Sequence, residues 1–309
     1  MSALITKPGA YPDIAAEDYN GREICPAPSI SSSGLKTMLK KSPFHYWWGS
    51  NLNPDKPAES DKAHFRVGKA VHDMLLLNER WPEFYHIVPD GFSEAHHKKW
   101  ADEMPAYHAA VERGAVILTE KQRDAVEAMA DAIQRNEFAA ASLTAGIPEM
   151  TLAWQDSETG VWLRARPDYL PDRVINGGDI RCVADIKTSA DASQGVFSRA
   201  IDSYGYHQSA ALYADGIKAI YGHYPTHWLH VVIEKDAPHC VALWELPGED
   251  IERGRYLNRF AIRAFADCLS KGKWPGYADN VSQCGLPAWA RKQIDEGNNP
   301  EGLAWAEAV

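Results

Sequence analysis

Acidic residues and one lysine stand out in a part of the chain that is otherwise apolar. Asp185 and Lys187 lie two residues apart in the segment CVADIKTS, while Asp168 and Glu149 occupy two preceding apolar segments. An aspartate and a lysine in such a segment are costly to bury without partners. Carboxylates that converge repel one another, and a hard divalent cation with oxygen ligands stabilises them. These residues therefore predict a site that binds Mg²⁺ together with substrate phosphates.

Strands must position these residues, because the hydrophobic period in this region is two. Residues i and i+2 of a strand point to the same face, so Asp185 and Lys187 should lie side by side. Opposite side chains of antiparallel neighbours are about 5 Å apart, so we expect Asp168 and Glu149 to converge on the pair. Three successive strands are expected at residues 147–155, 161–170 and 182–189.

Helices are expected before and after these strands, and the order of elements predicts an α/β fold with a central mixed sheet flanked by helices. The helical segments are residues 29–49, where Ser42-Pro43 ends the helix, 65–79, 119–141 with Thr119 as its cap, 193–221 and 249–272. Two further strands are expected at residues 227–235 and 240–247. We expect an N-terminal arm at residues 1–28, one domain at 29–273 and a C-terminal tail at 274–309.

The composition of the chain limits the classes of protein that it can represent. Its 309 residues include 32 Lys and Arg against 42 Asp and Glu, a net charge of −10. This excess speaks against a nucleic-acid-binding protein, unless positive charge is local or metal ions supply it. The five cysteines are odd in number and form no CxxC pair, so we expect reduced thiols in the cytoplasm and no iron–sulfur cluster. Neither a signal peptide nor a membrane-spanning segment is expected.

Further motifs join the acidic residues into a recognisable pattern. Pro167-Asp168, followed by Asp185-Ile186-Lys187, resembles the motif of the PD-(D/E)xK nucleases. An amphipathic helix carries Gly68-Lys69-Ala70-Val71-His72, which resembles the G-x-x-x-H helix of the RecB-like and RecE-like branch of these enzymes. In that branch, the helix donates a histidine to the metal site, a role that would fall to His72 here.

A second helix and the start of the domain extend the resemblance. Tyr206 and Tyr213 keep the seven-residue separation of the branch's Tyr/Gln helix, although Gln208 departs from its spacing. The opening S-x-S-G-L-K segment is similar to the start of phage and prophage RecE-type exonucleases, the exodeoxyribonuclease VIII family. The resemblance extends from about Ser29 to Lys273.

The resemblance implies a mechanism and a cofactor. The family digests linear double-stranded DNA processively from a 5′ end and leaves a 3′ single strand. Lys187 would orient the attacking water and stabilise charge on the phosphate. Mg²⁺ is the implied cofactor, and Mn²⁺ should substitute for it. The implied metal ligands are His72, Glu149, Asp168, Asp185 and the carbonyl group of Ile186.

Basic residues outside the metal site would contact DNA phosphates. We expect this role for Arg164, Arg166, Lys69, Arg66 and Lys36, together with Tyr206 and Gln208. Arg164 and Arg166 alternate along one strand and are expected to share a face with Asp168. The resemblance also implies a RecT-type single-strand annealing protein as partner, a homo-oligomeric ring (tetramer or trimer) and a bacterial or phage-infected cell. Two alternatives stay open: an endonuclease of the same superfamily, and a catalytically inactive DNA-binding or assembly protein.

Overall fold

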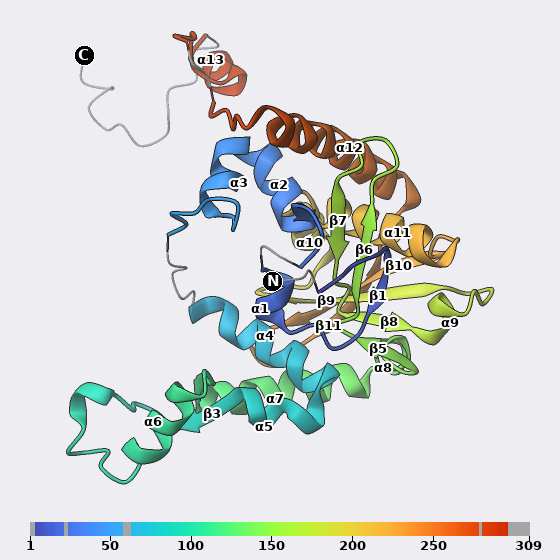
Figure 1. Ribbon diagram of the computed structural model, residues 1–309. Helices are drawn as coiled ribbons and strands as arrows, with labels where there is room; N and C mark the ends of the chain where they lie inside the picture. The colour runs from blue at the N-terminus through green and yellow to red at the C-terminus, as the bar shows by residue number, and fades with distance from the viewer. Residues whose placement is uncertain (1–3, 22–23, 58–62, 278–279, 296–309) are drawn as a thin grey trace. The chain divides into compact units, whose positions relative to one another are not determined.

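The computed structural model describes residues 4–21, 24–57, 63–277 and 280–295 (Figure 1). The chain forms two compact units, residues 1–274 and residues 275–309. The second unit contains the helix α13 (Ala288–Asp295). The first unit contains the strands and helices that position the predicted site. Among the described residues, no helix has both the length and the apolar character needed to cross a membrane.

A four-stranded sheet contains the predicted hairpin. Its order is β1 (Gly9–Tyr11), β6 (Thr151–Gln155), β7 (Trp162–Ala165) and β2 (Ser29–Ser31). β6 and β7 pair antiparallel, with Trp154 opposite Leu163, as the alternating pattern predicts. β2 lies parallel to β7 on its other side. β1 pairs antiparallel with β6, so part of the predicted N-terminal arm belongs to the sheet.

A three-stranded sheet contains the D-x-K segment. Its order is β11 (Val241–Glu245), β10 (His227–Glu234) and β9 (Cys182–Ser189). β10 lies antiparallel to β11 and parallel to β9, so this sheet is mixed. The prediction that β9 pairs with the preceding strand is wrong. Parallel strands need a long crossover, and here α10 (Gln194–Tyr204) and α11 (Tyr206–Tyr221) provide it.

Two further strand pairs are short, and two of the predicted strands are interrupted. β5 (Gly146–Pro148) pairs antiparallel with β8 (Tyr169–Pro171), and β3 (Tyr85–Val88) pairs parallel with β4 (Val116–Thr119). The strand predicted at residues 147–155 breaks at Glu149, whose φ of 51° is incompatible with a strand. The strand predicted at residues 161–170 breaks at a bend that contains Asp168.

Helices cover both sheets and close the core. α2 (Ser32–Lys40), α11 and α12 (Gly248–Lys271) pack with the four-stranded sheet around the buried rings of Trp154, Trp228 and Phe265. α4 (Ala63–Leu76) and α7 (Glu120–Arg135) pack against the other sheet in a second apolar cluster. The predicted α/β class, with mixed sheets flanked by helices, is confirmed (Figure 1).

Helix ends follow local capping chemistry. α7 begins after the predicted cap, Thr119, which forms a capping box with Gln122. The prediction that Ser42-Pro43 ends helical structure is wrong, because proline suits the first turn of a helix. Pro43 begins α3 (Pro43–Gly49), and the hydroxyl of the N-cap Ser42 accepts a hydrogen bond from the His45 N–H. Gly205, with φ 63°, divides the helix predicted at residues 193–221. Shorter helices are α1 (Ala16–Tyr19), α5 (Trp81–Phe84), α6 (Met104–Glu112), α8 (Glu137–Ser142) and α9 (Asp172–Ile175).

Candidate active site

The D-x-K segment of β9 brings a carboxylate and an ammonium group into contact. Lys187 Nζ lies 2.5 Å from Asp185 Oδ2 and donates to the Ile186 carbonyl oxygen at 3.0 Å. Burial alone would raise the pKa of Asp185, but the Lys187 ammonium and His230 hold this pKa well below its ordinary value. Burial alone would lower the pKa of Lys187, but the Asp185 carboxylate raises it. The two side chains therefore form a charged, nearly buried pair.

Asp168 reaches β9 from the bend between β7 and β8. Its Oδ2 accepts a hydrogen bond from the Ile186 N–H at 2.9 Å, and His72 Nδ1 lies 3.4 Å from the same oxygen. A side-chain carboxylate thus satisfies a backbone donor at the edge of the sheet, where a strand partner would otherwise be needed. This contact places Asp168 beside Asp185 without a hairpin between their strands.

Glu149 joins the site from the kink between β5 and β6. Its N–H donates to the Asp168 carbonyl oxygen at 3.1 Å, and its Oε2 lies 4.0 Å from Arg166 Nη1. Burial and the neighbouring Asp168 carboxylate raise the pKa of Glu149 to about 7. A left-handed backbone at a non-glycine residue costs about 1–2 kcal/mol, and such strain concentrates at functional sites. The strained backbone at this kink therefore holds the Glu149 carboxylate close to the Asp168 carboxylate.

His72 comes from α4, whose approach to β9 depends on Gly68. A Cβ atom at Gly68 would lie 3.0 Å from Thr188 Oγ1, so glycine permits this close contact. His72 follows one turn later on the same helix face. Burial alone would lower the pKa of His72, but the Asp168 carboxylate raises it overall. The G-x-x-x-H spacing thus has a physical basis, because Gly68 permits the contact of α4 with β9 and His72 reaches Asp168.

His230 is a site residue that the sequence reasoning missed. It lies opposite Asp185 in the parallel β9–β10 register, is 1% exposed, and its Nδ1 lies 3.2 Å from Asp185 Oδ2. Because the carboxylate accepts, Nδ1 carries the proton. The other ring nitrogen, Nε2, is buried beside Phe197 and Tyr206 and has no hydrogen-bond partner among the described residues. The available signal was a histidine at an inward position of the apolar segment HWLHVVIE.

The carboxylates of the site have the chemistry that a hard cation needs. Asp168 and Asp185 each use Oδ2 for the contacts above, and within the described residues neither Oδ1 makes a hydrogen bond. The described side chains do not surround a common point as a group of three His, Cys, Asp or Glu ligands. Mg²⁺ does not require such a cage, because it binds through one or two carboxylates, waters and substrate phosphates. The residues present therefore fit this cofactor.

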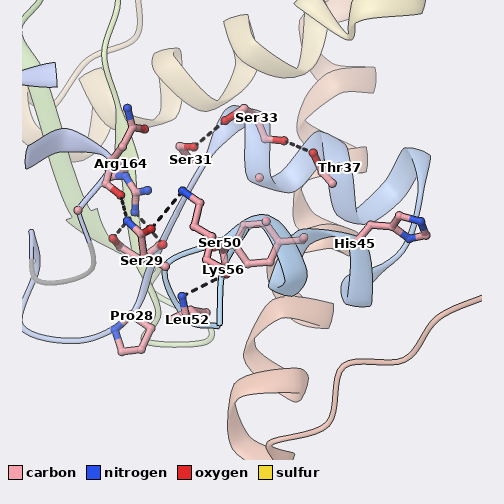
Figure 2. Close-up of a pocket in the computed structure, with 16 residues that line it drawn as sticks. Pro28, Ser29, Ser31, Ser33, Thr37, His45, Ser50, Leu52, Lys56 and Arg164 are labelled. Carbon is pink, nitrogen blue, oxygen red and sulfur yellow. Dashed lines mark hydrogen bonds between the residues drawn. The ribbon is translucent and has the colours of Figure 1, made fainter. Parts of the chain in front are cut away.

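The two arginines predicted to share a face take different positions. Arg166 lies beside Glu149, at 4.0 Å. Arg164 turns toward β2, where its Nη1 donates to the Ser29 carbonyl oxygen at 2.7 Å. Because β7 ends at Ala165, the alternation does not continue to Asp168. Arg166 thus belongs to the candidate active site, and Arg164 lines a separate cavity together with Ser29 and Lys56 (Figure 2).

The lysines predicted to bind DNA come from α2 and α4. Lys36 Nζ donates to Ser209 Oγ at 2.9 Å. Burial, and then the Lys187 ammonium, lower the pKa of Lys36 to about 8, so this lysine lies within electrostatic reach of the β9 pair. Lys69 forms an ion pair with the buried Asp73 on its own helix. Lys36 is therefore the better placed of the two to act at the site.

The other three residues predicted to contact DNA lie in different places: Tyr206 beside the site, Gln208 in the core and Arg66 at another cavity. The Tyr206 ring lies 5.3 Å from Lys187 Nζ, so it borders the site. Gln208 is 2% exposed, and its carbonyl oxygen accepts from Asn258 Nδ2 at 2.7 Å, which joins α11 to α12. This burial favours a packing role for Gln208 over a contact with a ligand. Arg66 is half-buried and lines a cavity between β3, β4 and α6.

The fold and this arrangement of acids and lysine define a protein of the PD-(D/E)xK nuclease superfamily. The chain belongs to the family of PDDEXK-like domains of unknown function (DUF3799), whose profile matches residues 31–287. A solved structure from Eubacterium rectale, provisionally described as an exonuclease, is similar in fold, with a TM-score of 0.56. The two sequences are 10% identical over 90% of this chain and 96% of that chain, a likeness of fold alone. No curated protein matches the sequence.

Proposed function

We propose that this protein is a Mg²⁺-dependent exonuclease that digests linear double-stranded DNA from 5′ ends and produces 3′ single-stranded tails for recombination by strand annealing. The Asp168 carboxylate accepts from the N–H of Ile186, the residue next to Asp185, and the Lys187 ammonium contacts Asp185; these contacts carry the proposal. The family match and the description of the E. rectale protein support phosphodiester hydrolysis. The RecE-type motifs support the substrate and the polarity.

The metal-binding residues would be Asp168 and Asp185, with Glu149 and His72 beside them. A divalent cation held there lowers the pKa of water and neutralises charge on phosphate oxygens. The Ile186 N–H keeps one carboxylate oriented, and its hydrogen bond leaves the other oxygen of that carboxylate available. Glu149, whose pKa is raised to about 7, can accept a proton near neutral pH.

Lys187 supplies the charge that the transition state needs. Its raised pKa keeps the ammonium protonated, and contact with Asp185 fixes its position. An ammonium held in advance stabilises charge that develops on the phosphate without reorganising at that moment. The Tyr206 ring beside it limits the directions from which water or a phosphate oxygen can approach.

Digestion of an end-labelled linear duplex with Mg²⁺ tests the proposal. Asp185→Asn and Lys187→Met should each lower the rate by about 100-fold or more, whereas Lys121→Met, an exposed lysine on α7, should not change it. Release of a 5′ label before a 3′ label would establish polarity. Full activity in both site variants, with folding verified by circular dichroism, would refute the assignment.

Two further measurements separate the open alternatives. A covalently closed duplex stays intact with an exonuclease, whereas an endonuclease of the same superfamily cuts it. Titration calorimetry with Mn²⁺ separates an enzyme from an inactive DNA-binding or assembly protein. Binding that is lost in Asp185→Asn supports the enzyme, and an absence of binding in the wild type supports the inactive protein.

The RecE-type motifs also support proposals about assembly and context. We infer a homo-oligomeric ring, a tetramer or trimer, that encloses the duplex and accounts for processivity. A RecT-type annealing protein would receive the 3′ tail, in the cytoplasm of a bacterial or phage-infected cell. Light scattering coupled to gel filtration measures the assembly directly, and a monomer at working concentration contradicts the ring.

A further inference from the structure

The N-terminal arm packs against the four-stranded sheet, next to the strands that lead into the candidate active site. β1 pairs with β6 (Figure 1), and Asp13, with φ 61°, turns the chain from β1 into α1. Aspartate tolerates such a left-handed backbone. Ile5 and Ile24 of the arm are buried in one apolar cluster with Trp162 of β7. The family profile begins at residue 31, so the arm precedes the matched residues.

Residues of the arm hold the guanidinium group of Arg166. Arg166 Nη2 donates to the Ile14 carbonyl oxygen at 2.8 Å, and Nε and Nη2 donate to Thr151 Oγ1 at 3.0 and 2.7 Å. Tyr19 is the last residue of α1, and the centroid of its ring lies 4.3 Å from the guanidinium carbon. A guanidinium this close to an aromatic face is attracted to it. The arm and β6 therefore fix the position and the rotation of this group.

The remaining nitrogen of Arg166 faces the candidate active site. The side chain is 10% exposed, and Nη1 lies 4.0 Å from Glu149 Oε2, too far for a hydrogen bond. Nη1 makes no hydrogen bond to the described residues, and it is not among their buried polar atoms that are closed to solvent. Because the other two nitrogens are bound, Nη1 is the donor that Arg166 offers to a ligand beside Glu149.

The Tyr19 ring acts as a neutral aromatic surface between two cationic groups. Its centroid lies 5.4 Å from the guanidinium carbon of Arg164, whose Nη1 donates to the Ser29 carbonyl oxygen at 2.7 Å (Figure 2). Burial raises the pKa of Tyr19 to about 12, although both arginines act to lower it, so the phenol keeps its proton. Its hydroxyl makes no hydrogen bond to the described residues. The contact with Arg166 therefore depends on the ring and not on the hydroxyl.

We propose that Tyr19 is a positioning residue of the candidate active site. Its ring and the Ile14 carbonyl group hold Arg166 so that Nη1 meets a backbone phosphate oxygen of the DNA strand beside Glu149. The inference rests on the proposed nuclease function for that substrate. Arg166 contacts the phosphate, and Tyr19 acts through Arg166. A donor held in place before the reaction stabilises charge on the phosphate without reorganising. Residues that precede the family match thus complete the site.

Two substitutions of Tyr19 separate the ring from its hydroxyl. Tyr19→Phe keeps the aromatic face, whereas Tyr19→Leu fills the space without it. Steady-state digestion of a linear duplex should give a kcat/KM about tenfold lower for Tyr19→Leu, because the guanidinium loses its fixed position. Tyr19→Phe should keep at least about half of the wild-type value. Equal losses in the two variants would overturn the proposal.

A packing control and a double variant test whether Tyr19 acts through Arg166. Ile5→Val removes a buried methylene group from the same cluster, so it should lower the denaturation midpoint and leave kcat/KM within about twofold of the wild type. Arg166→Met should lower kcat/KM by about 100-fold. Adding Tyr19→Leu to Arg166→Met should change it by less than about twofold, because residues that act as a unit are not additive. A further tenfold loss would contradict the proposal.

Binding without catalysis separates this inference from the proposed function. Fluorescence anisotropy without divalent metal should show that Tyr19→Leu binds a labelled duplex about threefold more weakly than Tyr19→Phe. If the wild type digests DNA but these two variants behave alike in both assays, the role of Tyr19 is overturned and the function stands. If the wild type does not digest DNA but the difference in affinity remains, the role of Tyr19 stands and the function fails.

Discussion

Replacement of His230 by leucine would show whether Asp185 must be held in one orientation to work. His230 is 1% exposed, and its Nδ1 donates to Asp185 Oδ2 at 3.2 Å. Leucine fills a similar volume and has no donor, so Asp185 would keep Lys187 and lose its second partner. The ion pair remains, which makes this a test of orientation and not of charge.

The structure predicts a small change in stability and a larger one in rate. Loss of a hydrogen bond to a charged acceptor costs about 1.5–3 kcal/mol, whereas removal of the buried, unpartnered Nε2 of His230 returns about 1–3 kcal/mol. The free energy of unfolding should therefore fall by no more than about 2 kcal/mol. Loss of a partner that orients a metal ligand costs about 10–100-fold in activity. We expect kcat to fall by that factor and KM to change little.

Denaturant titration and steady-state digestion of a linear duplex measure the two quantities separately. His230→Asn provides the matched variant, because its side-chain amide can donate from near the position of Nδ1. It should recover part of the lost kcat. A folded His230→Leu protein with the kcat of the wild type would refute the orienting role, and so would equal kcat values for the leucine and asparagine variants.

Three other changes probe the framework. Gly254→Ala should lower the free energy of unfolding by about 2 kcal/mol, because its Cβ would lie 2.2 Å from a carbonyl oxygen of α11, whereas Gly195→Ala, with nothing within 4 Å, should be neutral or stabilising; denaturant titration compares them. The pKa of Lys36 is lowered from 10.5 to about 8, so between these pH values the unfolded chain binds more protons than the folded protein does. The wild type should gain stability relative to Lys36→Met as pH rises through that interval. Asp156→Asn should cost about 2 kcal/mol through loss of the ion pair with Arg259. Because the pKa of Asp156 is lowered in the folded state, this difference should persist at neutral pH and disappear in acid, as pH falls through that pKa.

Hydrophobic period and turn chemistry predicted where strands lie better than how they pair. Residues 182–189 and the hairpin of β10 and β11 were predicted closely, because they are apolar runs bounded by polar segments. The pairing of β9 with β10 was not predicted, because it depends on a crossover of two helices whose direction is a tertiary property. The break at Glu149 was also missed, since neither Pro148 nor Met150 signals a left-handed backbone.

The candidate site was predictable where spacing alone places residues together. The i, i+2 relation predicted the contact of Asp185 with Lys187, and a helix turn relates Gly68 to His72. His230 was not predictable in this way, because a single histidine in an apolar strand is the ordinary pattern of a core residue. Its role depends on the register between two strands that lie far apart in the sequence.

The hydrogen bond between the Asp168 carboxylate and the Ile186 N–H has a consequence for folding. The acids, the lysine and the histidines come from five separate regions of the chain, and the Asp168 side chain joins the bend after β7 to the edge of the sheet that contains β9. Contacts of such long sequence separation form late, after the entropy of closing large loops has been lost. A nascent or partly folded chain therefore lacks the assembled candidate site, and the proposed activity would be confined to molecules that have completed their fold.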